Sequence, residues 1–219
     1  MPPVGERIRE ERLRRGMTLR GLARAVGVSA SLVSQVETGK SRPSVSTLYA
    51  ITQVLGISVE DVFDAGETAV PEPAAMTAQA MARAVQAAAV PDVGPDVGPA
   101  GGAERRVGPL VRPERREVLE LDSGVTWERL GRVPGSRVDF LLVTYAPGGC
   151  SSSAGGLMRH SGVEYGYLIE GELTLTLGFD EYRLVPGDAV SFASTTPHRY
   201  RNDGEHPAAG VWFVHEPDT

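Results

Sequence analysis

The stretch of residues 18–40 reads TLRGLARAVGVSASLVSQVETGK and contains two short apolar repeats on either side of Gly27. Apolar residues that recur every three or four positions predict helices with one buried face. Thr18 and Ser29 stand immediately before the repeats, where a side-chain oxygen would cap each helix, and Gly27 suits a turn with a positive φ. The inward positions are Leu19, Leu22 and Ala23 in the first repeat and Leu32, Val33 and Val36 in the second. The stretch therefore predicts two helices that cross closely around a tight turn.

The same periodicity continues outward from this stretch. An earlier helical pattern begins near Val4, and two further patterns follow at Val45–Leu55 and Val59–Phe63. Ser44 stands directly before the first of these two, in the position of an N-cap. Together the patterns predict an all-α domain of about five helices over residues 1–66.

Residues 67–113 have a different composition, because alanine, proline and glycine dominate them. Residues 91–98 repeat the tetrapeptide Pro-Asp-Val-Gly. Such a segment buries too little apolar surface to offset the entropy of ordering it, so it is predicted to be a linker. Residues 74–90 contain few helix breakers and could form a helix with an almost uniform alanine face.

From about residue 114 the apolar residues alternate with polar ones, which is the period of a strand. Five short runs of this kind are separated by turns rich in glycine, proline and aspartate. The runs are 118–121, 138–145, 172–177, 189–192 and 210–214. Residues 114–219 are therefore predicted to form an all-β sandwich or barrel. The fold class is α + β, with the helical and β parts in separate domains.

The composition of the 219 residues, 41% apolar and 23% charged, is that of an ordinary globular protein. No apolar run approaches the roughly 18 residues of a membrane span, and no secretory signal precedes the helices. The one cysteine, Cys150, excludes an internal disulfide framework and fits a reducing compartment. We therefore expect a cytoplasmic protein that does not interact with membranes.

The net charge of −6 is distributed unevenly along the chain. Residues 1–43 hold nine basic and four acidic side chains, a balance of +5 that leaves −11 on the remainder. A basic end on an acidic body suits the attraction of nucleic-acid phosphates to one surface. A solvated arginine-rich helix would give the same balance without any partner.

Two helices arranged in this way can place the first turn of the second helix in the major groove of DNA. Gln35 can then pair with adenine, Ser31 and Ser34 can reach a base or a phosphate, and Ala30 can touch a thymine methyl group. Flanking polar and basic residues suit phosphate contacts. The predicted DNA-contacting set is Thr18, Arg20, Ser29, Ala30, Ser31, Ser34, Gln35, Thr38, Lys40 and Arg42.

These residues match a known pattern. Residues 7–63 resemble the Cro-repressor-like (XRE family) helix-turn-helix domains, through Leu22-Ala23, Gly27-Val28-Ser29 and the run SQVETGK at 34–40. The resemblance implies base reading by the second helix and structural roles for Glu37 and Gly39. A helical domain that binds protein instead of DNA is the alternative.

In the β part, His160, Glu164 and His198 are candidate ligands of one site. His160 and Glu164 are four residues apart, so on one strand they would point to the same face. Two imidazoles and one carboxylate match a facial triad, which suits divalent iron, nickel or zinc. A polar pocket that binds a small effector without a metal is the alternative.

Residues 114–219 resemble the cupin fold, through His160-Ser-Gly-Val-Glu164, Pro186-Gly187-Asp188 and Pro197-His198. The resemblance implies that the triad lines the pocket of the domain. Metal-binding cupins usually carry another histidine two residues before His160, and this chain has Met158 there. A thioether is a poor ligand for these harder ions, so a metal would have three protein ligands.

The whole arrangement resembles bacterial regulators in which a cupin binds a small effector and often mediates dimerisation. It predicts a sequence-specific transcriptional regulator, not an enzyme, that binds a pseudo-palindromic operator as a homodimer. One alternative is a mononuclear-iron oxidoreductase similar to hydroxypropylphosphonate epoxidase, which also pairs such a helical domain with a cupin. Another is a metal-free cupin that serves only as a dimer scaffold. The basic surface and the polar face of the second helix favour the regulator.

Overall fold

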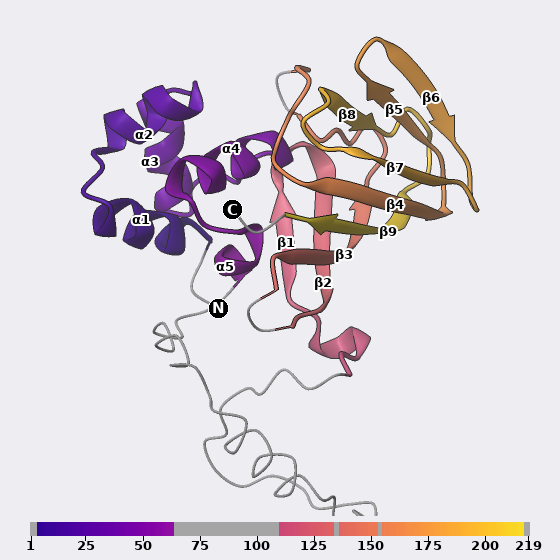
Figure 1. The fold of residues 1–219 in the computed structure, drawn as a ribbon, viewed down its shortest axis with the longest axis horizontal. Helices are drawn as coiled ribbons and strands as arrows, with labels where there is room; N and C mark the ends of the chain where they lie inside the picture. Colours follow the sequence, from indigo (N-terminus) through magenta and orange to yellow (C-terminus); the bar gives the residue numbers. More distant parts are fainter. Residues whose placement is uncertain (1–3, 64–109, 134–135, 153–154, 217–219) are drawn as a thin grey trace, which may run out of the picture. The chain divides into compact units, whose positions relative to one another are not determined.

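The computed structural model describes residues 4–63, 110–133, 136–152 and 155–216 (Figure 1). Residues 67–109 of the predicted linker, with the possible helix at 74–90, lie outside the described residues. The described helices and strands belong to a single compact unit. Contacts between the helical and β parts are therefore part of one body.

The helical part confirms the five predicted helices, and no described helix is long and apolar enough to cross a bilayer. Thr18 and Ser29 cap their helices as expected, because each side-chain oxygen accepts a hydrogen bond from a backbone N–H of the first turn. Gly27 ends the second helix with φ 81°. The helices are α1 (Val4–Arg14), α2 (Leu19–Val26), α3 (Ala30–Glu37), α4 (Val45–Leu55) and α5 (Val59–Phe63).

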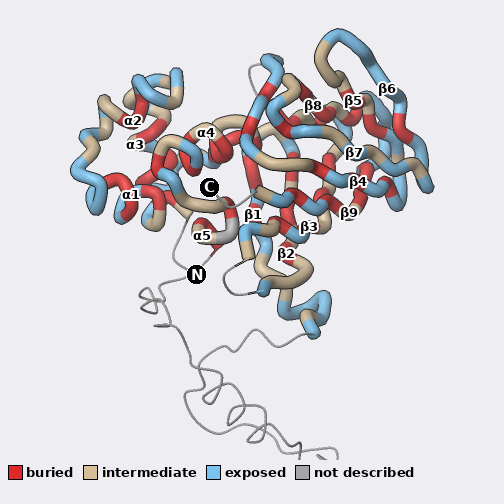
Figure 2. Tube along the Cα trace, viewed as in Figure 1, coloured by how far each residue is buried: buried red, intermediate tan, exposed pale blue. Residues whose placement is uncertain are grey.

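Helix α3 packs directly on α1. A Cβ added to Gly5 of α1 would lie 1.9 Å from the carbonyl oxygen of Val36, so only glycine allows the two backbones to approach this closely. Val33 and Val36 of α3 are buried and belong to the same apolar cluster as Leu22 and Leu48. Figure 2 shows buried stretches along α1, α3 and α4. The opposite face of α3 is left exposed to solvent.

A buried ion pair holds the end of α3. Arg12 Nε donates to Glu37 Oε1 at 2.6 Å and Arg12 Nη2 donates to Glu37 Oε2 at 2.8 Å, with side-chain exposures of 8% and 3%. Arg12 Nη1 also donates to the carbonyl of Met17. The hydrogen bond to Glu37 raises the pKa of Arg12 above its ordinary value. Removing one partner of such a pair costs about 3–5 kcal/mol, because the other charge stays buried.

The C-terminal part is all-β, as predicted. Its strands form a six-stranded antiparallel sheet of order β1-β2-β3-β9-β4-β7 and a three-stranded antiparallel sheet of order β6-β5-β8. Two single-turn 3-10 helices, Pro113–Arg115 and Asp122–Gly124, flank β1. The strands are β1 (Val118–Leu121), β2 (Val125–Gly131), β3 (Val138–Tyr145), β4 (Val163–Glu170), β5 (Leu173–Leu177), β6 (Asp180–Leu184), β7 (Ala189–Ala193), β8 (His198–Arg201) and β9 (Ala208–His215).

The five predicted strand runs correspond to β1, β3, β5, β7 and β9. The five apolar runs did not include β2, β4, β6 or β8. Strand β6 has the sequence DEYRL, and four of its five residues are exposed, because β6 is an edge strand paired only with β5. An edge strand needs backbone pairing on one side and no apolar face, so its sequence carries little periodicity.

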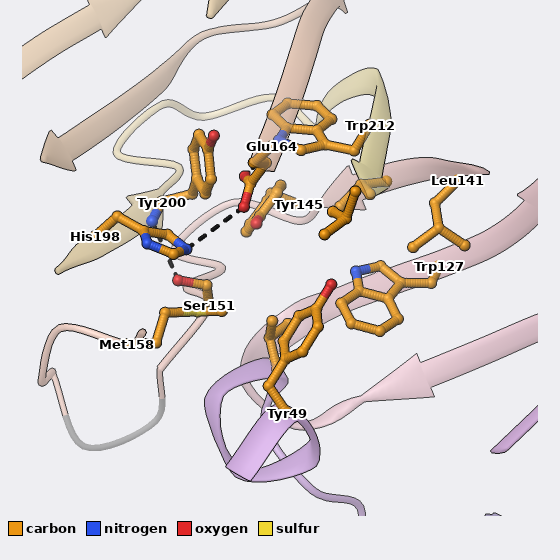
Figure 3. Close-up of a pocket in the computed structure, with 13 residues that line it drawn as sticks. Tyr49, Trp127, Leu141, Tyr145, Ser151, Met158, Glu164, His198, Tyr200 and Trp212 are labelled. Carbon is orange, nitrogen blue, oxygen red and sulfur yellow. Dashed lines mark hydrogen bonds and ion pairs between the residues drawn. The ribbon is translucent and has the colours of Figure 1, made fainter. Parts of the chain in front are cut away.

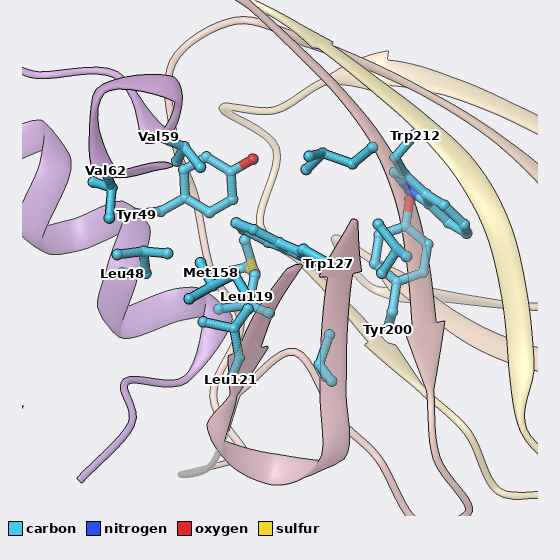
Figure 4. Packing of buried hydrophobic residues seen from close by; sticks show 14 of the residues in the cluster. Leu48, Tyr49, Val59, Val62, Leu119, Leu121, Trp127, Met158, Tyr200 and Trp212 are labelled. Carbon is cyan, nitrogen blue, oxygen red and sulfur yellow. The ribbon is translucent and has the colours of Figure 1, made fainter. Parts of the chain in front are cut away.

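The cores of the two parts are continuous. Figure 4 shows Leu48 and Tyr49 of α4 in the same apolar cluster as Leu119, Leu121 and Trp127 of the β part. Backbone hydrogen bonds run beside the cluster, from Asp122 N to Pro43 O at 2.9 Å and from Ser46 N to Ser151 O at 3.0 Å. The start of α4 is therefore joined to the β part by both main-chain bonds and apolar packing.

Candidate functional site

The predicted DNA face lies along the solvent side of α3 and the segments next to it. Eight of the ten predicted residues are exposed, and Ala30 and Ser34 are half-buried. Gln35 is exposed, and its Nε2 lies 3.5 Å from Ser31 Oγ one turn earlier. The structure thus places the base-reading candidates on one accessible helix face, while Val33 and Val36 anchor the other face.

Some of the ten side chains already have local partners. Ser29 Oγ accepts from Leu32 N as the helix cap, and Thr38 Oγ1 donates to Ser34 O at 2.8 Å. Arg42 Nη2 lies 2.5 Å from Glu120 Oε2 of β1, with both side chains more than half exposed. An exposed pair of this kind contributes little stability, so a DNA phosphate could displace Glu120 from Arg42.

The structure brings His160, Glu164 and His198 together in the β part. The Nε2 atoms of His160 and His198 lie 3.4 Å and 3.5 Å from Glu164 Oε2, and all three ligand atoms are within 4.8 Å of one another. All three side chains are buried. Three groups from separate segments of the chain therefore converge on one point inside the domain.

The two imidazoles are oriented by their backbone contacts. His160 Nδ1 donates to the carbonyl of Ser161 at 3.0 Å, and His198 Nδ1 donates to the carbonyl of Thr196 at 2.9 Å. A carbonyl only accepts, so each Nδ1 carries the proton, and in a neutral ring Nε2 is then a bare acceptor. Both Nε2 atoms are buried without a hydrogen-bond partner. Both Nε2 atoms face Glu164 Oε2, so a proton or a cation could lie between the two rings and the carboxylate.

Glu164 is held in place from its other side. Trp212 Nε1 of β9 donates to Glu164 Oε1 at 3.1 Å. Burial raises the pKa of Glu164, but the interactions with the nearby imidazoles of His160 and His198 outweigh it and keep the pKa of Glu164 below its ordinary value. Burial also lowers the pKa of His198, against the opposing effect of Glu164.

The reason given for pairing His160 with Glu164 was wrong, although the pairing itself is observed. The two residues do not share a strand, because β4 begins at Val163 and His160 precedes a bend. Gly162 has φ 100°, and a Cβ there would lie 2.4 Å from the carbonyl oxygen of His215. The chain turns at this glycine, and a hydrogen bond from His160 N to Ser194 O holds the histidine beside the strand.

A cavity of about 30 Å³ adjoins the triad (Figure 3). Glu164, His198 and Met158 line it, and the other lining residues were not singled out from the sequence. Aromatic side chains dominate the wall. They are Tyr49 of α4, Trp127, Tyr145, Tyr200 and Trp212. Tyr165 and Tyr167 lie on the exposed side of β4 and do not line this cavity.

Met158 occupies the position at which metal-binding cupins carry a further histidine. It is buried, lines the same cavity, and pairs with His198 through two backbone hydrogen bonds of 2.8 Å and 2.9 Å. Among the described residues, the metal-competent group of nitrogen and oxygen ligands comprises His160, Glu164 and His198. The site could hold a metal ion through these three side chains.

Comparison with known proteins agrees with both halves of this description. Residues 8–62 match the family described as Helix-turn-helix, and residues 141–214 match the Cupin domain. The chain is 26% identical over 220 residues to the HTH-type transcriptional regulator PuuR of Escherichia coli (strain K12), covering 98% of this chain and 95% of PuuR. It is 42% identical over 57 residues, 26% of this chain, to an uncharacterized HTH-type transcriptional regulator of Archaeoglobus fulgidus, and covers 81% of that protein.

A crystal structure of an HTH_3 family transcriptional regulator from Vibrio cholerae has the same fold. It superposes with a TM-score of 0.61 at 19% identity, covering 99% of this chain and 96% of that one. Hydroxypropylphosphonic acid epoxidase from S. wedmorenis is more distant, with a TM-score of 0.42 at 18% identity over 97% of this chain and 96% of the epoxidase. The latter likeness is too low to carry an argument about activity.

An exposed recognition helix and a β domain with a buried polar pocket define a two-domain DNA-binding regulator. The chain belongs to the helix-turn-helix transcriptional regulators of the XRE type, and it carries a C-terminal cupin domain.

The DNA face generates the first prediction. On a fragment that the wild-type protein selects from random DNA, Gln35→Ala is expected to weaken binding by about 1–3 kcal/mol and to relax the preference at one base pair. Arg42→Ala is expected to lower the affinity for all DNA sequences by the same factor. It is also expected to reduce the slope of log affinity against log salt concentration by about one. Titrations of fluorescent DNA at several salt concentrations measure both effects.

Gln53→Ala is the matched control, because Gln53 is exposed on α4 and outside the predicted face. Glu120→Gln tests the competition for Arg42 and should strengthen binding only while Arg42 is present. Unchanged affinity in both Gln35→Ala and Arg42→Ala would show that another surface contacts DNA.

Proposed function

We propose that this transcriptional regulator responds to a small ligand at His160, Glu164 and His198, and that the ten residues named for the α3 region contact its operator. The observation that supports the ligand site is the convergence of two unpartnered Nε2 atoms and one carboxylate oxygen inside a closed domain. Buried polar atoms are normally hydrogen-bonded, and those that are not call for a partner.

A divalent cation fits the donor set. Two imidazoles and a carboxylate are borderline ligands suited to iron, nickel or zinc. Backbone carbonyls orient both rings, and Trp212 orients Glu164, as outer partners commonly do at metal sites. When bound, the ion would supply a positive charge that organises an anionic or polar effector. The protein residues would contribute its ligands and a largely aromatic enclosure.

A regulatory role is favoured over catalysis by the state of the helical part. Helix α3 presents polar side chains on an accessible face, and residues 1–43, which include α3, carry a net basic surplus.

Binding as a homodimer is proposed from the exposed face of the large sheet. A single helix-turn-helix contacts few bases, so specificity calls for two copies on half-sites about 10 bp apart or a multiple of that spacing. Four exposed aromatic side chains stand on β3, β9 and β4, and the ring centroid of Phe213 lies 6.4 Å from that of Phe140 and 6.2 Å from that of Tyr165. Phe213 is the shared neighbour, and a shallow groove of about 380 Å³ lies beside it. The four are Phe140, Tyr165, Tyr167 and Phe213.

The ligand site is tested with a metal ion alone. Co²⁺ added to chelator-treated protein is expected to bind with a stoichiometry of one per chain. Glu164→Gln and His160→Ala are each expected to lower the Co²⁺ affinity by at least about tenfold, because loss of a residue that only supports a metal ligand already costs about tenfold. Isothermal titration and the visible absorption of Co²⁺ measure the binding. His206→Ala is the control, because His206 is exposed and remote from the triad. Equal Co²⁺ affinity in the wild-type protein and both triad variants would contradict the site.

The dimer face is tested by charge. Tyr167→Glu places a carboxylate in the aromatic face and is expected to shift the protein towards monomers in sedimentation equilibrium, because a buried unpaired charge is costly. Phe179→Glu, at the exposed turn between β5 and β6, is the control. A wild-type protein that sediments as a monomer at micromolar concentration, or a Tyr167→Glu variant with the wild-type mass, would refute the proposal.

A further inference from the structure

One wall of the cupin cavity comes from the helix-turn-helix. Tyr49 of α4 is 4% exposed, and its ring stacks on the imidazole of His160 with centroids 3.9 Å apart and planes 3° apart. The edge of Trp127 packs against the same ring at 5.7 Å, and the Tyr49 hydroxyl donates to Asp139 Oδ2 at 3.5 Å. Figure 3 shows Tyr49 reaching from its helix towards the side chains of the β part.

A second connection reaches the cavity from the start of α4. Ser46 N donates to the carbonyl of Ser151 at 3.0 Å, and Ser151 Oγ accepts from Tyr200 N at 3.1 Å. Ser151 and Tyr200 both line the cavity. Helix α4 is therefore seated on two walls of the pocket, through Tyr49 and through Ser151.

The cavity is too small for an organic ligand, so the position of α4 in its wall matters for ligand entry. About 30 Å³ suffices for an ion or about two waters, whereas pockets for small organic ligands usually measure about 300–1,000 Å³. An organic ligand at the triad must therefore displace part of the wall. Trp127, Tyr145 and Trp212 stand on β2, β3 and β9, each paired with a strand on both sides. Tyr49 stands on a helix outside the sheets, so its movement breaks no strand pairing.

Displacing Tyr49 would move more than one ring. Leu48 and Ile51 of α4 are fully buried in the helical core, and α4 packs on α1 and α2. Helices α1 and α2 in turn hold α3. Packed cores shift between discrete arrangements and do not deform continuously, so a change in the seat of α4 carries the recognition helix with it.

We propose that Tyr49 is the gate of the cupin pocket: ligand entry requires its ring to leave His160, and this movement reseats the DNA-binding helices. The inference rests on the proposed ligand site and assigns the residue through which occupancy reaches DNA. The coupling free energy between two sites is reciprocal. DNA that favours one position of α4 must therefore also change the access of ligands to the pocket.

The four histidines of the chain allow the gate to be tested without knowing the ligand. Diethyl pyrocarbonate acylates unprotonated imidazole nitrogens, and its rate at each histidine is read by mass spectrometry of the peptides. A chelator keeps metal away from Nε2. His160 and His198 fall in separate tryptic peptides, because Arg183 lies between them. His206 and His215 are exposed and report any global change in reactivity.

Tyr49→Ala is expected to raise the acylation rate of His160 by about tenfold, which corresponds to loss of roughly 1.4 kcal/mol of closing free energy. Tyr49→Phe retains the ring and should stay within about twofold of the wild-type rate, as should Gln53→Ala on the exposed side of α4. Tyr49→Leu keeps apolar volume without the stacking face, so it replaces Tyr49→Ala if circular dichroism shows that the alanine variant unfolds.

The second arm adds the selected DNA fragment. Binding of DNA is expected to change the His160 rate in the wild-type protein and to leave it unchanged in Tyr49→Ala or Tyr49→Leu. A His160 rate that does not respond to loss of the Tyr49 ring, or a wild-type rate that does not respond to DNA, overturns the gate. Neither result depends on Co²⁺ binding, so failure of the ligand site and failure of the gate are distinguished.

Discussion

The carboxylate of Glu164 lies in the interior of the β domain, where an unpaired charge would cost several kcal/mol. Trp212 offsets part of that cost by donating to one oxygen. The Nε2 atoms of His160 and His198 face the other oxygen, where a proton or a cation would offset the rest. Strands β4, β8 and β9 carry three of these four groups, while the bend at Gly162 directs the fourth. The pocket is therefore built around one buried charge that the donor of Trp212 offsets only in part.

The same buried charge explains why the helical part matters to the β part. His160 is oriented by the carbonyl of Ser161 on one side and covered by the ring of Tyr49 on another. Interfaces between domains of one chain are commonly small and polar, which allows them to move. Here the interface includes a side chain that completes the pocket of the neighbouring domain. In the proposed mechanism, ligand binding and operator binding therefore affect each other through the contact between Tyr49 and His160. Coupling of this kind does not require the linker.

Sequence reasoning predicted the helices well, because Thr18, Ser29 and Gly27 mark their ends by local chemistry. It found the triad through spacing and resemblance, although the shared-strand argument for His160 failed at Gly162. Strands such as β6 escaped notice because an edge strand has no buried face to impose a period. No sequence pattern indicated that Tyr49 lines the pocket. It occupies an ordinary apolar position of α4, and its contacts with His160 and Trp127 are set by tertiary packing, which periodicity within one helix does not encode.

The most direct test of the account is a distance distribution between the two parts. Cys150 is the one native cysteine, so a Cys150→Ser background accepts spin labels at Arg24→Cys of α2 and Phe179→Cys of the β5–β6 turn, both exposed. Labelled protein diluted with unlabelled protein reports distances within one chain by pulsed electron resonance. A single narrow distribution that broadens on Tyr49→Ala is predicted. A broad distribution in the Tyr49-containing protein would show that the helices are only tethered to the cupin, and would contradict the account.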